Sequence, residues 1–99
     1  MSYLIAVSFD IMNATSKNYE DLYSRLNSIG LSKYLTADNG TEIKIPTTTT
    51  LAGIFEGNSI EEIRNYITNE TKKIFQQLYL KGEIFVFVGG NWGWQKSVV

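Results

Sequence analysis

Two stretches of helical periodicity, each bordered by strand-like segments, most narrowly limit the folds open to this chain. In both, apolar residues recur every three or four positions, as on a helix that buries one face. The first stripe comprises Tyr19, Leu22, Tyr23, Leu26 and Ile29, and the second comprises Ile63, Tyr66, Ile67, Ile74, Phe75 and Leu78. We expect Asn18 to cap the first helix and Gly30 to end it. Ser59 to Glu62 form a capping box that opens the second helix, which Gly82 is expected to end.

Strand-like segments lie before, between and after the two helices. The first is apolar and is expected to be covered on one face and paired on both edges. Asn39 and Gly40, preceded by Asp38, favour a tight turn between two short strands because both tolerate a positive φ. Pro46 interrupts the second of these strands. The expected strands cover residues 3–9, 33–37, 41–45, 47–56 and 83–88.

This order of strand, helix, hairpin, helix and strand predicts an α+β fold of the ferredoxin-like βαββαβ type. Its antiparallel sheet carries two helices on one face and is extended by an extra β-hairpin arm. At 99 residues the chain is expected to form a single domain, residues 1–99, with a tryptophan-containing C-terminal tail from about residue 89 to residue 99. The second face of the sheet would be bare, and exposed apolar sheet is costly. We therefore expect a homodimer in which a second copy covers that face.

The composition narrows the available chemistry. The chain contains no cysteine and no histidine, which excludes disulfides, thiolate or imidazole metal ligands and the commonest general base. Carboxylates and hydroxyls remain as reactive groups. The formal net charge of −1 is unlike that of a protein which relies on nonspecific phosphate contacts. The chain shows neither a secretory leader nor an apolar run of membrane-spanning length, so we expect a cytoplasmic protein with no membrane partner.

Asp10 is the carboxylate in the most defined position. It follows the first strand directly, at the carboxyl end where α/β sheets commonly expose their chemistry. Its side chain is therefore a candidate catalytic or metal-binding group. The alternative is that it accepts hydrogen bonds from backbone N–H groups of the loop at residues 11–14.

Several other residues are candidates for binding. Trp92 and Trp94 lie in a glycine-containing tail, where indoles stack on nucleic-acid bases, anchor a protein partner, or pack across a dimer interface or over the sheet edge. The threonine run at residues 47–50 either offers hydroxyls to a ligand or favours a strand. Either of two cationic groupings is a candidate to guide a phosphate, and Lys72 and Lys73 have the alternative of forming the solvated face of a helix. The groupings are Lys72 and Lys73 with Lys81, and Lys17 with Arg25.

Two segments carry a resemblance to a known superfamily. The opening sequence Tyr3-Leu4-Ile5-Ala6-Val7-Ser8-Phe9-Asp10 resembles the first strand of the small CRISPR-associated endoribonucleases, of the ribonuclease antitoxin GhoS and of the SinR-like proteins. The closing sequence Phe85-Val86-Phe87-Val88-Gly89-Gly90-Asn91-Trp92 resembles the last strand of some of these proteins. The resemblance implies a ferredoxin-like fold, dimerisation and a functional aspartate at Asp10. The chain departs from the CRISPR-associated members in its long threonine-rich hairpin and in its tail, which has Lys96 as its only basic residue, so it is most similar to the SinR-like branch.

Two functions follow as hypotheses. The first is a Mg²⁺-dependent endoribonuclease of a defence or toxin–antitoxin system, acting on single-stranded RNA as a dimer. In it, Asp10 of each subunit binds the metal ion and is the catalytic residue, while Ser8 and Asn13 hold water or phosphate. The second is a non-catalytic dimeric module that binds RNA, a protein or a small regulator, with Trp92 and Trp94 as the contact residues.

Overall fold

The strand β1, Ser2–Ile11, lies at the centre of the fold and pairs on both of its edges. In the computed structural model, which describes residues 1–37 and 39–99, β1 runs antiparallel to β4 on one side and to β5 on the other. The remaining elements are α1 (Ser16–Ser28), β2 (Tyr34–Thr36), β3 (Glu42–Lys44), β4 (Thr50–Glu56), α2 (Ile60–Gln77) and β5 (Gly82–Gly89). The expectation of a central first strand is therefore confirmed, and so is the α+β class.

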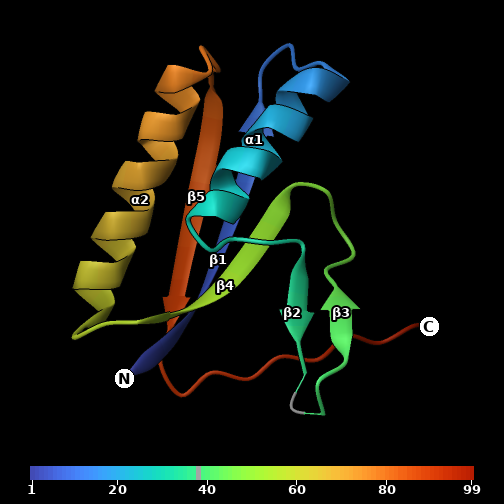
Figure 1. Ribbon diagram of the computed structural model, residues 1–99, viewed down its shortest axis with the longest axis vertical. Helices are drawn as coiled ribbons and strands as arrows, with labels where there is room; N and C mark the ends of the chain where they lie inside the picture. The colour runs from blue at the N-terminus through green and yellow to red at the C-terminus, as the bar shows by residue number, and fades with distance from the viewer. Residues whose placement is uncertain (38) are drawn as a thin grey trace.

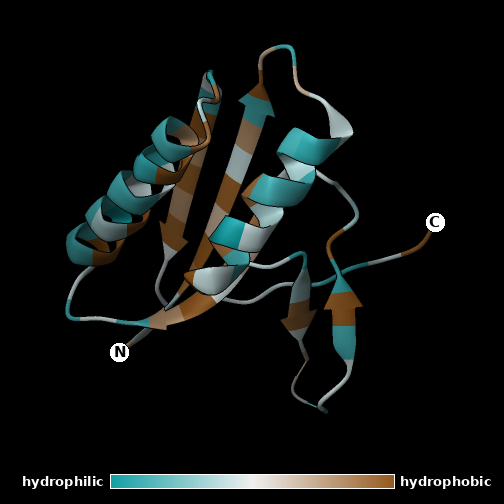
Figure 2. Ribbon diagram, turned by 45° about the horizontal axis from the view of Figure 1, so that its top comes forward, coloured by the Kyte–Doolittle hydropathy of each residue, from teal (hydrophilic) through white to brown (hydrophobic). Residues whose placement is uncertain are grey.

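Both helices cover the same face of this three-stranded sheet (Figure 1). Tyr3, Ile5, Val7, Phe9 and Ile11 alternate along β1 and are all buried beneath the helices. Their neighbours on the other face are partly or fully exposed, as the two-residue period of a strand requires. The helices turn their hydrophilic side outward, which Figure 2 shows as teal on their outer surfaces.

The first helix begins earlier than the sequence indicated. Its N-cap is Thr15, whose hydroxyl accepts from the backbone N–H of Asn18, while the Asn18 side chain accepts from the backbone N–H of Thr15. The prediction of Asn18 as the N-cap was therefore wrong, because this asparagine is the third residue of a reciprocal capping box. Gly30, with a φ of 103°, ends α1 as expected.

The second helix ends earlier than expected. Ser59 is its N-cap, but the last helical residue is Gln77, and Tyr79 rather than a glycine takes the left-handed conformation beyond it. Gly82 instead begins β5, where a side chain would clash with the backbone oxygen of Asp10. The predicted stripe of α2 also needs one correction. Tyr66 is 48% exposed, and Thr71 takes the buried position next to Ile67 and Ile74.

The predicted hairpin arm exists as a two-stranded sheet of its own, β2 with β3. It stands beside the main sheet in Figure 1, and its turn carries a positive φ at Gly40; Asp38 of the predicted turn lies outside the described residues. The hairpin is joined to the main sheet through Ser32, which exchanges two backbone hydrogen bonds of 2.8 Å with Ala52 of β4. The expected strand from residue 47 starts only at Thr50, since the Thr47 hydroxyl is hydrogen-bonded to the hydroxyl and the backbone N–H of Thr49 in a turn.

Candidate functional site

The face of the sheet opposite the helices carries a row of exposed apolar side chains. The pairing register places Ile54 across from Leu4, and Phe87 and Phe85 across from Ala6 and Ser8. Phe85 is 69% exposed, Phe87 54% and Ile54 46%. We call this surface, formed by the even-numbered residues of β1 and β4 and their partners on β5, the open face.

Asp10 lies at one end of the open face, with an exposed side chain. Its direct cross-strand partner is Glu83, which is also exposed, so two carboxylates occupy opposite positions in the ladder. Like charges in this arrangement repel each other unless a cation or a donor lies between them. Within residues 1–37 and 39–99, no group of three or more Asp, Glu, His or Cys side chains is placed to hold a metal ion. A metal ion bound here would therefore take two carboxylates from one chain.

Ser8 and the threonine run form a hydroxyl cluster near the end of the open face at which Asp10 lies. The Ser8 and Thr50 hydroxyl oxygens are 2.9 Å apart across the β1–β4 ladder. Thr47 accepts a hydrogen bond from the backbone N–H of Thr49, and the Tyr23 phenol donates to the backbone oxygen of Thr48. The hydroxyls of Ser8, Thr47, Thr49 and Thr50 are thus hydrogen-bonded within the protein, a structural role that such residues take in turns.

Tyr23 belongs to an aromatic cluster with Phe9 and Tyr19, whose ring centroids lie 6.1–6.4 Å apart. The Lys33 ammonium lies 4.2 Å from the centre of the Tyr23 ring. Burial raises the pKa of the Tyr23 phenol above its ordinary value of 10.0; the hydrogen bond to Thr48 opposes this shift and Tyr19 adds to it. The phenol therefore stays protonated at neutral pH and keeps its donor to the threonine loop.

Asn13 lies away from the open face, in the turn between β1 and α1. It has a φ of 53° and lines a hollow of about 320 Å³ together with Asn18, Tyr79 and Lys81. The backbone N–H of Met12 donates to the backbone oxygen of Lys81 at 2.8 Å, and both residues line this hollow. The structure does not place Asn13 and Ser8 together beside Asp10, so the three residues do not form one binding site.

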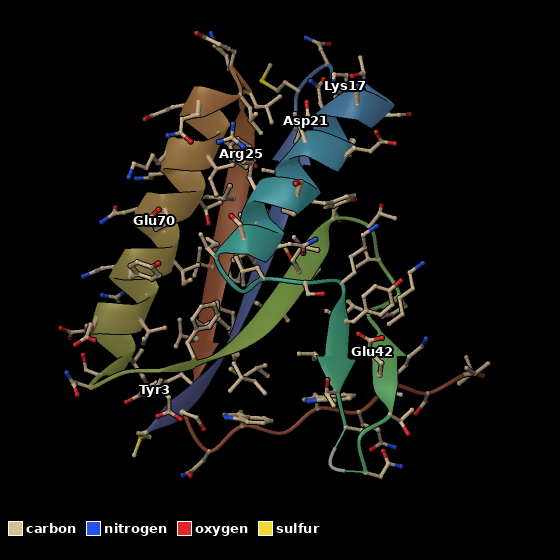
Figure 3. All side chains as sticks on the ribbon, viewed as in Figure 1. Tyr3, Lys17, Asp21, Arg25, Glu42 and Glu70 are labelled. Atoms are coloured by element: carbon tan, nitrogen blue, oxygen red, sulfur yellow. The ribbon has the colours of Figure 1, made fainter. Side chains whose placement is uncertain are left out.

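Trp92 and Trp94 do share a site. They line a groove of about 520 Å³ between the C-terminal tail and the β2–β3 hairpin. The Trp92 indole N–H donates to the Ser2 hydroxyl at 3.4 Å. A Cβ added to Gly90 would lie 3.6 Å from the ring of Tyr3, which Figure 3 labels. We call this hollow the tail groove. Its lining residues are Thr36, Ala37, Ile43, Trp92, Gly93, Trp94, Gln95 and Lys96.

The tail groove and Asp10 lie at opposite ends of β1. Trp92 is bonded to Ser2 at the start of the strand, whereas Asp10 is its penultimate residue. Eight residues of extended strand separate the two positions by roughly 26 Å. The candidate carboxylates and the candidate aromatic residues therefore form two separate sites.

The cationic groupings fit the solvated interpretation. Lys17 pairs with Asp21 at 3.5 Å on the exposed side of α1, and Figure 3 shows both on the same helix. Arg25 donates to the Gln77 side chain at 3.1 Å and so links α1 to α2. Lys72 and Lys73 are exposed on α2.

Sequence reasoning found the two tryptophans but missed Glu83 and the hairpin residues of the groove. Glu83 lies opposite Asp10 because of the β1–β5 register, and Ile43 lines the tail groove because the tail passes the hairpin. Alternation along the last strand was the one signal that could have placed Glu83 on the face of Phe85 and Phe87.

The chain matches no protein-family model and no curated protein sequence. Across residues 1–37 and 39–99, a helix that combines the length and the apolarity needed to span a bilayer is not found. The open face, the carboxylate pair and the tail groove are the features of the described residues that bear on function.

Proposed function

We propose that this protein is a homodimeric, ferredoxin-like binding module that takes a small ligand into the tail groove. The ferredoxin-like assignment is supported by the position of β1 between β4 and β5. Ser32 pairs with Ala52 on the outer edge of β4, in the place of a fourth strand. Two helices on one face complete this arrangement.

The observation that carries the proposal is the tail groove. Its volume of about 520 Å³ lies within the range of about 300–1,000 Å³ that is typical of small-molecule sites. Both tryptophans of the chain line it, together with the apolar Ile43 and the polar Thr36 and Gln95. Aromatic walls with a few polar groups are the usual composition of such sites.

Dimerisation is supported by the open face. Leu4, Ile54, Phe85 and Phe87 form a contiguous apolar surface on a small domain, and such a surface marks an interaction site. A second copy of the chain offers the same apolar row, so a two-fold pairing buries both rows at once.

Ligand binding in the groove is tested by following the two indole N–H signals in a proton–nitrogen correlation spectrum while aromatic fragments are added. We expect bound fragments to shift both indole signals and the amide of Ile43, because these groups line one hollow. The amide of Asn13, at the other end of β1, serves as the control and should stay in place. Fragments that shift only amides far from the hairpin and tail would contradict the proposal.

The carboxylate pair supports a second candidate function, Mg²⁺-dependent cleavage of single-stranded RNA. Asp10 and Glu83 are direct cross-strand partners, and Mg²⁺ prefers carboxylate and water oxygens. A dimer axis parallel to β1 would bring both pairs to the same end of the assembly. The resemblance to the small CRISPR-associated endoribonucleases and to GhoS leads to the same residue, Asp10.

This second candidate is tested with Mg²⁺ and Mn²⁺ on the wild type and on Asp10→Asn, Glu83→Gln and the control Glu61→Gln. A metal ion bound by the pair raises the melting temperature of the wild type and of the Glu61 control only. Cleavage of single-stranded RNA should be lost with EDTA and in Asp10→Asn. A melting temperature that ignores both ions, together with intact RNA, would rule this candidate out.

A further inference from the structure

We propose that the ligand of the tail groove is a single nucleotide, with its base against the indoles and its phosphate towards Lys96. The inference rests on the proposed function of the groove as a ligand site and adds the chemical class of the ligand. It is independent of Asp10, which lies at the other end of β1.

The shape of the groove fits a ligand of this size. The tail is anchored where it leaves the sheet by the Trp92–Ser2 hydrogen bond. Beyond this anchor it passes the hairpin, and a Cβ placed on Gly93 would have no atom within 4 Å. Apart from its chain neighbours Trp92 and Trp94, no described residue comes close to Gly93, so the groove is open at this position. A hollow of about 520 Å³ accommodates one nucleotide, and it is not the long channel that tracks a nucleic-acid backbone.

The chemistry of the lining favours a planar aromatic group. The indole of tryptophan offers a large π surface, and stacking on such a surface accepts every base because each base has a π face. Ile43 and Ala37 add apolar contact area, and Thr36 and Gln95 can hydrogen-bond to the edge of a base.

The charge of the groove favours an anion. Among the described lining residues, Lys96 is the single charged side chain, and its charge is positive. The whole chain has a net charge of −1, which disfavours the binding of a long sugar–phosphate backbone. It does not disfavour the binding of one phosphate group beside one lysine. These two observations select a mononucleotide over a nucleic-acid strand. They also favour a mononucleotide over a proline-rich peptide, because binding of such a peptide does not require the positive charge of Lys96.

Titration calorimetry with the four ribonucleoside monophosphates, their nucleosides and inorganic phosphate tests this inference. Tryptophan fluorescence provides the location, since both tryptophans of the chain line the groove. We expect nucleotides to bind and to quench the fluorescence, nucleosides to bind more weakly and phosphate alone to leave the fluorescence unchanged.

Two variants and two matched controls complete the experiment. Trp94→Leu should weaken nucleotide binding about tenfold, as expected for one lost stacking contact. Lys96→Gln should weaken it about threefold and abolish the advantage of nucleotides over nucleosides. Lys72→Gln removes the same charge from α2, and Tyr66→Leu removes an exposed aromatic ring from the same helix. Neither control should change the affinity.

The outcomes separate this inference from the proposal on which it rests. If proline-rich peptides or neutral aromatic fragments bind in the groove and nucleotides do not, the nucleotide assignment is overturned and the ligand site stands. If nothing binds in the groove, both are overturned. Nucleotide binding that both Trp94→Leu and Lys96→Gln leave unchanged would also overturn the assignment, because the nucleotide would then occupy another surface.

Discussion

Thr71 has an unusual environment for a polar side chain. It is fully buried on the inner side of α2, and among the described residues it is the only buried polar side chain. Its hydroxyl oxygen has no hydrogen-bond partner in the protein. A buried hydroxyl without a partner costs free energy, because water solvates it in the unfolded chain and nothing replaces that water in the core.

Thr71→Val should therefore raise the free energy of unfolding by about 1 kcal/mol, since valine has nearly the same shape and no hydroxyl. Urea denaturation measures the change. Thr68→Val, a half-buried position one turn earlier on α2, is the matched control and should change stability by less than about 0.5 kcal/mol. A loss of stability in Thr71→Val would mean that the hydroxyl has a hydrogen-bond partner, such as an internal water.

At the scale of single residues, the sequence identified the candidate residues better than it identified the residues that lie next to them in space. Trp92 and Trp94 stand out by type, because large aromatic side chains in a glycine-containing tail are conspicuous. The opposition of Asp10 and Glu83 depends on the register between strands more than 70 positions apart, which no local pattern encodes. Ser8 was a candidate by proximity to Asp10 in sequence, but its hydroxyl is engaged by Thr50.

The two helices end with the same hydrogen-bond motif built on different residues. In α1, the N–H of Gly30 donates to Asn27 and that of Leu31 donates to Leu26. In α2, Tyr79 donates to Gln76 and Leu80 donates to Phe75 in the same pattern. Both are Schellman motifs, in which the residue after the C-cap is left-handed. Glycine takes that place without strain, whereas tyrosine at a φ of 55° does not.

Tyr79→Gly should therefore stabilise the protein by about 0.5–1 kcal/mol, because relief of the left-handed strain exceeds the entropic cost of glycine. The tyrosine side chain is 94% exposed, so little packing is lost. Thermal and urea unfolding measure the effect.

The reciprocal change at the end of α1 is the control. Gly30→Ala should destabilise by about 1–2 kcal/mol, because the φ of 103° is strained for alanine and a Cβ would lie 3.0 Å from the Phe55 ring. Equal effects of the two substitutions would contradict the explanation.

Removal of the tail after Gly90 should leave the α/β core folded. The tail has no helix or strand, and the core side chains all precede it. We expect the truncated protein to keep its far-ultraviolet circular dichroism and to lose binding in the tail groove, because five of the eight lining residues are removed. A truncated chain that unfolds would show that the tail contributes to the core.

Element boundaries were predictable where the signal is local. The helical stripes, the N-cap at Ser59 and the stop at Gly30 depend on residues a few positions apart, and the structure confirms them except at Tyr66, which is exposed. The β propensity of the threonine run did not produce a strand before Thr50. There, hydroxyl-to-backbone bonds and the Tyr23 phenol hold a turn instead. The end of α2 was mispredicted because the left-handed position is filled by a tyrosine, which carries no stop signal of its own.

At the scale of the whole molecule, the open face is the feature that most directly predicts how copies of the chain assemble. Phe85→Lys places a charge at the most exposed side chain of the apolar row and should convert the proposed dimer to a monomer. The side chain is 69% exposed in the single chain, so the monomer should stay folded. Tyr66→Lys, on the outer side of α2, is the matched control. Sedimentation velocity on both variants and the wild type measures the result; a wild type that is monomeric at micromolar concentration would exclude the dimer.

The β2–β3 hairpin is a two-stranded sheet of three residues a side, joined to the rest by Ser32 and flanked by the tail. Such a small sheet is marginal by itself in water. It should therefore open far more often than the core, and its amides should exchange with deuterium orders of magnitude faster than those of β1. A ligand in the groove touches both hairpin and tail, so it should slow this exchange selectively. The least stable part of the molecule would then report occupancy, with the core as its internal reference.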